Sequence, residues 1–296
     1  MKSGFVGIVG RPNVGKSTLL NAFLGEKIAI TSAKPQTTRN AIRGIYTGDD
    51  VQIVFIDTPG IHKAKNKLGN FMYESVLRTL SEVDAIVYIT DDGLSSGPGE
   101  RYITELLSSS SKPKLLAINK IDAMEPDEFK RIYDEYDESG IFDEIFGISA
   151  LNGLAVDKLL SSLCARMPEG PMYFPGDMIT DSPERFVVSE IIREKLLLYL
   201  EDEVPHGVAV EIESFEEPER EGGTTGIGAV IYCEKKSHKG IIIGKDGRKL
   251  KGVGKAAREE IEALLGTKVF LKLWVKVKEG WRDSEIALSN FGYRAE

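Results

Sequence analysis

Short apolar runs alternate with longer amphipathic segments through the first 165 residues of the chain. The runs occupy residues 5–10, 51–57, 85–90, 114–120 and 144–149. Because they are short and apolar nearly throughout, they indicate strands that are buried on both faces. Helical patterns lie between them, at residues 16–24, 69–81, 99–108, 126–139 and 155–166. The alternation predicts an α/β domain in which helices cover a mostly parallel sheet.

A proline-rich stretch at residues 167–184 interrupts this pattern, with four prolines and two glycines. Proline fixes φ and lacks an amide donor, so neither a helix nor a central strand continues through the stretch. We therefore expect a first domain at residues 1–170, a linker at residues 171–184 and a second domain at residues 185–296.

The second region has a different order of elements. The pattern predicts a helix at 185–204, a strand at 206–217, a glycine-rich turn at 219–228, a strand at 229–236, a basic helix-turn-helix and a final strand at 268–278. Apolar and polar residues alternate along the final strand, which is typical of a strand covered on one face only. The region is therefore expected to form a smaller α+β domain.

Composition is that of an ordinary soluble protein, with a formal net charge of -8. No apolar run reaches the roughly 18 residues of a membrane helix, and the amino terminus has no cleavage site of a secretory signal. Cys164 and Cys233 lack metal-site or redox spacing, which favours free thiols without a disulfide partner in a reducing cytoplasm. We expect a cytoplasmic protein.

The segment Gly10–Ser17, "GRPNVGKS", fits the pattern G-x-x-x-x-G-K-[ST] between a predicted strand and a predicted helix. Its glycines let successive backbone N–H groups point at phosphate oxygens, and the helix amino terminus adds the positive end of its dipole. Lys16 is expected to reach the β- and γ-phosphates, and the Ser17 hydroxyl to hold Mg²⁺. The segment predicts a nucleoside triphosphate site.

Two later segments select the base. In "NKID", Asn119–Asp122, the Asp122 carboxylate can accept from both donors of guanine, and adenine lacks that pair of donors. An unpaired buried acceptor costs about 1–3 kcal/mol, so the site should reject ATP. Backbone amides of Ser149–Leu151 are expected near the guanine O6 atom, and we predict a GTP site.

Between these segments lies "DTPG", Asp57–Gly60, at the end of an apolar run. A carboxylate at Asp57 can order the Mg²⁺ shell, and the Gly60 amide can sense the γ-phosphate. A threonine of "KPQTTR" can complete the shell; we favour Thr38, although Thr37 is hard to separate from it.

A basic tract surrounds Gly244-Lys245-Asp246-Gly247. Residues 235–258 hold nine Lys or Arg and one acid, so this window carries +8 in a chain of -8. The alternative is a solvated helix face, but the acidic remainder of the chain argues against a generic basic surface. With its flanking helices and strands, the tract resembles a KH domain, which clamps about four nucleotides of single-stranded RNA.

These segments resemble the P-loop GTPase superfamily. Within it, "KEGWRDSE" at 278–285, the QTTR loop, "DTPGIHK" and the basic tract resemble the bacterial ribosome-assembly GTPases, which join a GTPase domain to a KH domain. The resemblance covers residues 1–290, and Ala64 in place of proline is a small departure. It implies a GTP-hydrolysing switch that binds the 3′ end of small-subunit ribosomal RNA and assists small-subunit assembly.

The residues assigned to GTP are Gly10, Arg11, Pro12, Asn13, Val14, Gly15, Lys16, Ser17, Thr18, Asp57, Thr58, Pro59, Gly60, Ile61, Asn119, Lys120, Ile121, Asp122, Ser149, Ala150 and Leu151. The predicted catalytic residues are Lys16, Thr38 and Gly60, and the Mg²⁺ ligands are Ser17, Thr38 and Asp57. The residues assigned to RNA are Lys239, Ile243, Gly244, Lys245, Asp246, Gly247, Arg248, Lys249, Lys251 and Lys255, with Ile241–Ile243 as the groove floor.

Ile61 occupies the place where GTPases of the Ras type carry a glutamine that positions water. An aliphatic side chain cannot align water, so unaided turnover should be slow. The resemblance implies that Asn13 helps hold a potassium ion beside the phosphates; the alternative is that Asn13 only shapes the loop.

Three other functions are compatible with parts of the sequence. The first is a constitutive RNA-binding protein in which GTP is structural. The second is a GTPase of tRNA modification, which the missing cysteine near the carboxyl terminus disfavours. The third is peripheral attachment to the inner membrane through residues 191–204, which the acids of that segment disfavour, although the resemblance leaves a weak membrane-associated fraction open.

Overall fold

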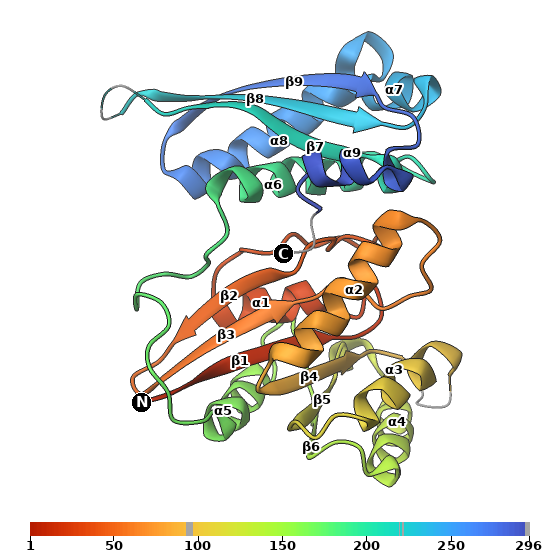
Figure 1. Ribbon diagram of the computed structural model, residues 1–296, viewed down its shortest axis with the longest axis vertical. Coiled ribbons are helices and arrows are strands. Elements are labelled where there is room, and N and C mark those ends of the chain that lie inside the picture. The colour runs from red at the N-terminus through yellow and green to blue at the C-terminus, as the bar shows by residue number, and fades with distance from the viewer. Residues whose placement is uncertain (93–96, 219, 221, 294–296) are drawn as a thin grey trace. The chain divides into compact units, whose positions relative to one another are not determined.

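The structure, a computed structural model, describes residues 1–92, 97–218, 220 and 222–293. The chain divides into two compact units (Figure 1). The first comprises residues 1–65 and 69–181, and the second comprises residues 66–68 and 182–296. No helix in the described ranges is long and apolar enough to span a membrane.

The first unit is built on a six-stranded sheet with the order β2-β3-β1-β4-β5-β6. Only β2 runs antiparallel to its neighbour, so the predicted mostly parallel sheet is confirmed. The strands are β1 (Lys2–Val9), β2 (Ile42–Thr47), β3 (Val51–Asp57), β4 (Ala85–Thr90), β5 (Lys114–Ile118) and β6 (Glu144–Gly147).

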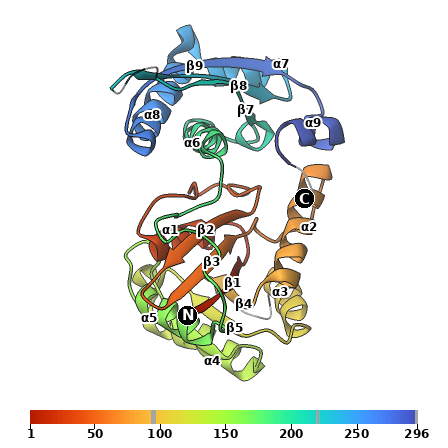
Figure 2. The same ribbon diagram turned by 60° about the vertical axis from the view of Figure 1, so that its left-hand side comes forward.

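Helices cover both faces of this sheet, with α1 and α5 on one side and α2 and α3 on the other (Figure 2). Apolar side chains of α2, α3 and α4 pack with β1, β3, β4 and β5 in one buried cluster, as the continuous apolar runs require. The helices are α1 (Lys16–Leu24), α2 (Lys67–Glu82), α3 (Pro98–Ser108), α4 (Pro126–Ser139) and α5 (Val156–Arg166).

The stretch expected to link the two domains runs along the first unit. The Ile45 amide donates to the Ile179 carbonyl at 2.9 Å, and the Gln52 side chain bonds the backbone of Phe174 at 2.9 and 3.0 Å. Residues up to 181 therefore belong to the first compact unit. One of the strands that these residues contact, β2, was not predicted.

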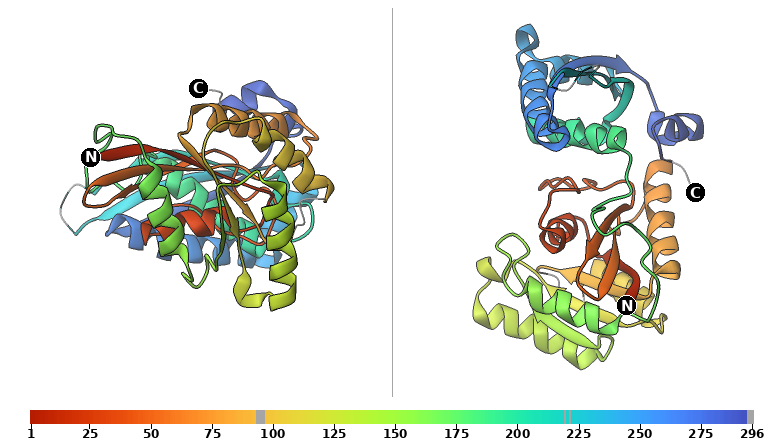
Figure 3. Two further views of the ribbon diagram at one scale, coloured as in Figure 1. Left: turned by 90° about the horizontal axis from the view of Figure 1, so that it is seen from below. Right: turned by 90° about the vertical axis from the view of Figure 1, so that its left-hand side faces the viewer.

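The second unit has a three-stranded sheet with the order β7-β8-β9, in which β8 is antiparallel to β7 and parallel to β9. Its core joins α6 and α8 to one face of the sheet (Figure 3). The elements are α6 (Glu184–Tyr199), β7 (Ala209–Glu216), β8 (Thr224–Cys233), α7 (Lys236–Ile243), α8 (Arg248–Leu265), β9 (Lys268–Val277) and α9 (Glu285–Asn290).

Several boundaries in this unit were predicted wrongly: the helix expected at 185–204 ends at Tyr199, and the strand expected at 206–217 begins at Ala209. The glycine-rich stretch at 219–228 was expected to be a turn, but β8 begins at Thr224 and pairs with both neighbours from there on. A Cβ atom at Gly228 would lie 2.6 Å from Ser214 Oγ and 3.2 Å from the Trp274 ring, so this glycine allows close packing within the sheet. Residues 219, 221 and 294–296 of the expected turn and terminus lie outside the described residues.

Candidate functional site

A cavity of about 440 Å³ lies in the first unit beside the amino terminus of α1. It is lined by residues from the segments 12–18, 30–38, 119–123 and 149–151, together with Gly60. The segment 30–38 lies between α1 and β2, and the others follow β1, β3, β5 and β6, whose carboxyl ends meet at one edge of the parallel sheet. This edge is where open α/β sheets bind their ligands.

The loop between β1 and α1 has the conformation that its glycines permit. Gly15 has φ of 106°, and Asn13 also has positive φ, at 67°. Lys16 donates to the carbonyl oxygens of Arg11 at 2.7 Å and Gly10 at 3.3 Å. Burial lowers the pKa of Lys16 to about 8, although the nearby Asp57 carboxylate opposes this shift. The loop thus presents a buried ammonium group and the α1 amino terminus to one side of the cavity.

Ser17, Thr38 and Asp57 converge beside this loop. Ser17 Oγ donates to Asp57 Oδ2 at 2.6 Å and lies 2.9 Å from Thr38 Oγ1. Asp57 is fully buried, and its Oδ1 atom has no hydrogen-bond partner within the described chain. Burial raises the pKa of this carboxyl to about 6, while Lys16 lowers it. Two hydroxyls and a carboxylate with an unpaired oxygen fit Mg²⁺, which completes its shell with water and phosphate oxygens.

The side-chain contacts of Thr37 and Thr38 differ, although the sequence could not distinguish their roles. Thr37 Oγ1 donates to the Lys34 carbonyl at 2.6 Å and so is engaged within its own loop. Thr38 Oγ1 instead lies 3.3 Å from Asp57 Oδ2. This arrangement supports Thr38 as the metal-facing residue.

Gly60 lies against the phosphate loop, whereas the Ile61 side chain points into the apolar core. A Cβ atom at Gly60 would overlap the backbone of Pro12, so this residue lies directly against the phosphate loop. Ile61 donates its amide to the Gly10 carbonyl at 3.1 Å, while its side chain is buried in the apolar cluster. The Ile61 side chain therefore does not line the cavity.

Predicted base-recognition residues from the segments 119–122 and 149–151 line the same cavity. Asn119 donates to the Val14 carbonyl at 2.8 Å and accepts from the Ala150 amide at 2.9 Å, so one buried side chain joins three segments. Asp122 is exposed and lines the cavity with Ser149. The carboxylate is thereby accessible to a base.

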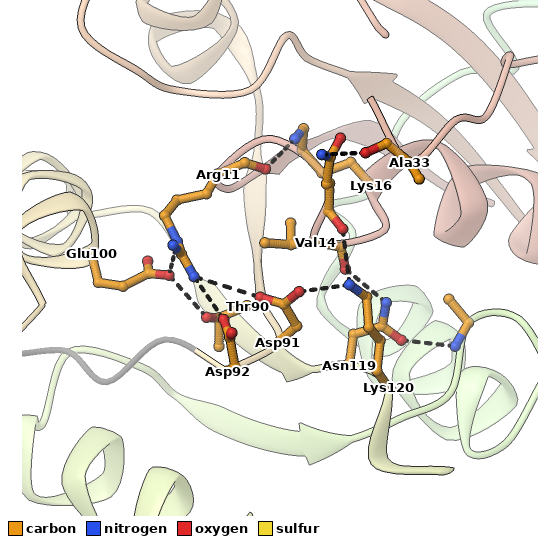
Figure 4. A network of polar contacts seen from close by, with 12 residues as sticks. Arg11, Val14, Lys16, Ala33, Thr90, Asp91, Asp92, Glu100, Asn119 and Lys120 are labelled. Atoms are coloured by element: carbon orange, nitrogen blue, oxygen red, sulfur yellow. Dashed lines mark hydrogen bonds and ion pairs between the residues drawn. The ribbon is translucent and has the colours of Figure 1, made fainter. Parts of the chain in front are cut away.

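Charged side chains connect the phosphate loop with the base-recognition segment, and of these the sequence did not indicate Asp91, Asp92 and Glu100 (Figure 4). Arg11 of the phosphate loop pairs with Glu100 at 2.5 Å, Asp92 at 3.0 Å and Asp91 at 3.6 Å. Asp91 also accepts from Lys120 at 2.6 Å, and Lys120 reaches the Asn13 carbonyl at 3.0 Å. Asp91 therefore bridges the phosphate loop and the base-recognition segment.

Not every predicted residue faces the cavity, and some lining residues were missed. Of the residues assigned to GTP, those that do not line it are Gly10, Arg11, Val14, Asp57, Thr58, Pro59, Ile61, Ile121 and Ala150. The lining residues that the sequence did not indicate are Ile30, Thr31, Ser32, Ala33, Gln36 and Ala123. Asn13 Nδ2 donates to the Ala33 carbonyl at 2.7 Å, and such a backbone contact leaves no signal in the sequence.

The second unit places the Gly-x-x-Gly turn between α7 and α8. Gly244, Asp246 and Gly247 all have positive φ, at 70°, 54° and 72°. A Cβ atom at Gly244 would lie 2.7 Å from the Lys249 Cβ atom, whereas one at Gly247 would meet nothing within 4 Å. The turn is therefore sharp, and its backbone is open to a ligand on the Gly247 side.

The basic side chains around this turn are largely exposed, at Lys239, Lys245, Arg248, Lys251 and Lys255. Arg248 lies 3.4 Å from Asp246, and Lys255 lies 3.9 Å from Glu259. Lys245, Lys249 and Lys251 have no ion pair with an acid in the described ranges. Ile242 is fully buried in the core, so the expected groove floor is wrong at this position, while Ile241 is exposed and Ile243 half-buried.

Comparison with known proteins gave matches for both units. Residues 5–120 match a family model described as 50S ribosome-binding GTPase, and residues 203–282 match the KH domain. GTPase Era of Alkaliphilus oremlandii (strain OhILAs) is 58% identical over 293 residues, which are 99% of each chain. GTPase Era of Clostridioides difficile (strain 630) is 56% identical over 99% of this chain and 98% of its own.

Two solved structures resemble the whole chain. The crystal structure of Era in complex with MgGDPNP and nucleotides 1506–1542 of 16S ribosomal RNA is 40% identical, with a TM-score of 0.95 over 100% of both chains. A variant of Aquifex aeolicus Era bound to GDP·AlF₄⁻ is 39% identical, with the same TM-score and coverage.

Proposed function

Since this chain belongs to the Era family of GTPases, we propose that it is a GTP-driven switch that binds the 3′ end of small-subunit ribosomal RNA and assists small-subunit assembly. Its KH domain would hold the RNA, and its first unit would bind GTP and Mg²⁺ and hydrolyse GTP. The observation that carries the proposal is the pairing of one phosphate-loop cavity with one basic Gly-x-x-Gly turn in a single chain.

Within the nucleotide site, Lys16 would contact the β- and γ-phosphates, and Ser17, Thr38 and Asp57 would hold Mg²⁺. When bound, Mg²⁺ neutralises charge that develops on the phosphate oxygens. Gly60 would offer its amide to the γ-phosphate, since its backbone lies against Pro12 of the phosphate loop. Asp122 would accept from guanine, supported by its exposed place in the cavity wall.

The side chain at position 61 cannot align a water molecule for hydrolysis, because Ile61 is aliphatic and is buried among apolar residues. The proposal includes a potassium ion beside Asn13, which would supply positive charge near the phosphates. Turnover should then be faster in K⁺ than in Na⁺, and Asn13→Ala should abolish the difference. Equal rates of wild-type hydrolysis in both salts would leave Asn13 as a loop-shaping residue, bonded to Ala33.

RNA binding would use Lys245, Arg248, Lys249, Lys251 and Lys255 on phosphates, with the Gly244–Gly247 backbone close to the strand. The relative bound to nucleotides 1506–1542 of 16S ribosomal RNA supports this partner. The central experiment measures the affinity of the full chain for that RNA with GDPNP and with GDP. A difference supports a switch, and identical affinities would remove switching while leaving both binding sites in place.

A separate variant tests whether nucleotide is only structural. If GTP merely stabilised the fold, Lys16→Ala would lower thermal stability and leave RNA binding and ribosome assembly unchanged. For a switch, the same variant should bind RNA at one fixed affinity, whatever the nucleotide, and fail to support assembly in cells.

The remaining parts of the proposal concern organisation and place. Residues 1–170 would act as the GTPase domain, residues 171–184 as the linker and residues 185–296 as the RNA-binding domain. A cytoplasmic site of action follows from the proposed partner, which is assembled there. Peripheral contact of a fraction of the protein with the inner membrane stays a prediction.

A further inference from the structure

The sheet of the second unit has a face that α6 and α8 do not cover (Figures 1 and 3). The β9 residues that point to it alternate with the core residues Val269 and Val275, and we call them the β9 row. The row consists of Lys268, Phe270, Lys272, Trp274, Lys276 and Lys278. It holds four lysines, two aromatic rings and no acid.

Both rings of the row are open to solvent, Phe270 at 57% and Trp274 at 46% of their surface. On β8, Phe270 pairs with Gly226, Lys272 with Gly228 and Trp274 with Val230. The Trp274 ring lies over Gly228, whose missing Cβ would be 3.2 Å from it. Phe270 and Trp274 are four residues apart, which places their Cα atoms about 13 Å apart along the strand, and each ring keeps a large part of its surface exposed.

The charge of this face is divided between its two edges. On the β7 side, Glu211, Glu213 and Glu216 are acidic, and Glu213 pairs with Lys276 at 2.8 Å. On the β9 side, Lys272 lies over the Phe270 ring at 5.2 Å and has no acidic partner among the described residues. Positive charge is thus confined to a narrow track along β9.

The described part of the carboxyl-terminal segment, which ends at residue 293, contacts one end of this face. Phe291 packs against Tyr232 of β8 with 4.7 Å between ring centroids, and Lys278 lies 4.7 Å from the centre of the Phe291 ring. The stretch from Phe270 to Trp274 lies beyond these contacts and keeps the exposures given above. Among the residues that the structure describes, Phe270 and Trp274 thus stay exposed beside Lys272.

We propose that the β9 row is a second RNA contact, on which bases of a single strand stack while lysines meet the phosphates. It lies on the sheet face opposite the helices that carry the Gly-x-x-Gly turn, and it rests on the proposed function as an RNA-binding protein. Aromatic platforms interleaved with cations are typical of single-strand binding without sequence preference. The row would therefore extend the grip on RNA beyond the roughly four nucleotides that the turn clamps.

Two other occupants fit this face less well. The centre of a protein interface is depleted in lysine, whereas lysine separates the two rings here. An anionic membrane is flat, so contact with it would press the β7 glutamates onto like charge. A single RNA strand can instead follow β9 alone and avoid the acidic edge.

Tryptophan fluorescence of the full chain offers a direct test, because the chain has two tryptophans and Trp281 is fully buried. Titration with RNA of nucleotides 1506–1542 should quench the Trp274 emission, and the Trp274→Phe variant should lose that quenching. Quenching that persists in Trp274→Phe, or none in the wild type while RNA binds, would overturn the proposal. So would a response to phosphatidylglycerol vesicles without a response to RNA.

Affinity measurements separate this site from the turn. Phe270→Leu and Trp274→Leu keep apolar surface but remove stacking, and each should weaken binding of the same RNA about tenfold. Tyr173→Leu is the matched control, because Tyr173 is 46% exposed and lies in the first unit. Unchanged RNA affinity in both leucine variants would contradict the second RNA contact. Failure of the wild type to bind RNA would contradict the proposed function itself.

Discussion

At the scale of single residues, Asp91 connects two parts of the nucleotide site. Its carboxylate accepts from Lys120 at 2.6 Å and lies 3.6 Å from Arg11 (Figure 4). Burial opposes its ionisation, but the Lys120 hydrogen bond outweighs this, and the pKa of Asp91 is lowered. The stem of Lys120 is therefore held where it can cover one face of the base.

We predict that Asp91→Asn speeds GDP release about fivefold, since a partly exposed charge pair contributes on the order of 1 kcal/mol. The dissociation rate of a fluorescent GDP analogue measures this in stopped flow. Asp92→Asn is the control, because Arg11 is the only ion-pair partner of Asp92 among the described residues and the Asp92 side chain is 77% exposed. An equal effect of both substitutions would mean that only the Arg11 contacts matter.

A second prediction at this scale concerns pH. Burial raises the pKa of Asp57 from 3.8 to about 6, and Mg²⁺ requires the ionised carboxylate. Below pH 6 a proton must leave before the metal binds, so the apparent Mg²⁺ affinity at saturating GDP should fall about tenfold per pH unit. Above pH 6 it should be flat. Titrations of Mg²⁺ from pH 5 to 7.5 test this, and a flat profile throughout would contradict the assignment of Asp57.

In the absence of metal, the raised pKa of Asp57 makes the folded protein less stable as the pH rises. A carboxyl group whose folded pKa exceeds its unfolded value favours the protonated native state. The contribution of Asp57 to the free energy of unfolding is therefore greatest at low pH and decreases as the pH rises from 3.8 to about 6. Metal binding above pH 6 would offset this loss.

The sequence predicted residues whose role depends on local spacing and missed those whose role depends on tertiary contact. Lys16 and Ser17 follow from one loop and the helix after it, so their place could be inferred directly. Arg11 was assigned from the phosphate-loop pattern, but its partner Glu100 lies 89 positions further along the chain, where no pattern marks it. Such an ion pair becomes visible only once β1 and β4 lie side by side.

At the scale of elements, α8 shows how an amphipathic helix serves two purposes. Val253, Ala257 and Ile261 lie on one face and are fully buried against the sheet, while basic residues occupy the other. The buried stripe anchors the helix that follows the Gly-x-x-Gly turn. Loss of packing in this stripe should therefore loosen the RNA-binding unit without touching its charges.

We predict that Ile261→Ala lowers the free energy of unfolding of the second unit by about 2–5 kcal/mol, through lost burial and a residual cavity. Both tryptophans belong to this unit, so their fluorescence during urea denaturation reports its unfolding. Leu264→Ala, on the same helix but 40% exposed, should change the value by less than about 1 kcal/mol. Comparable losses in both variants would contradict the packing described here.

Some elements with strong periodicity were predicted nearly to the residue, whereas others, among them β2 and β8, were not. The helix at 126–139 and the strand at 268–278 match α4 and β9 closely. The β2 strand was missed because "IRGIYT" is short, and its position depends on pairing with β3. The start of β8 was missed because glycines indicate a turn locally, whereas here they make room for Trp274 and Ser214.

At the scale of the whole molecule, charge is divided very unevenly. The window 235–258 carries +8 while the chain carries -8, so the remaining residues sum to -16. The acidic body would repel RNA, and the basic turn would attract it. Approach should therefore be oriented, with little adsorption elsewhere on the surface.

This division leads to a prediction about salt. If Lys245, Arg248, Lys249, Lys251 and Lys255 each neutralise one phosphate, the logarithm of the RNA association constant should fall with the logarithm of salt with a slope of about -3.5. Affinity should then drop ~100-fold between 50 and 200 mM salt. Lys251→Ala, which removes an exposed lysine without an acidic partner in the described chain, should reduce the slope by about 0.7. Lys130→Ala, an exposed lysine of the first unit, should leave the slope unchanged, because its charge lies on the acidic body. A slope near zero in the wild type, or equal effects of both substitutions, would show that the basic turn is not where RNA phosphates bind.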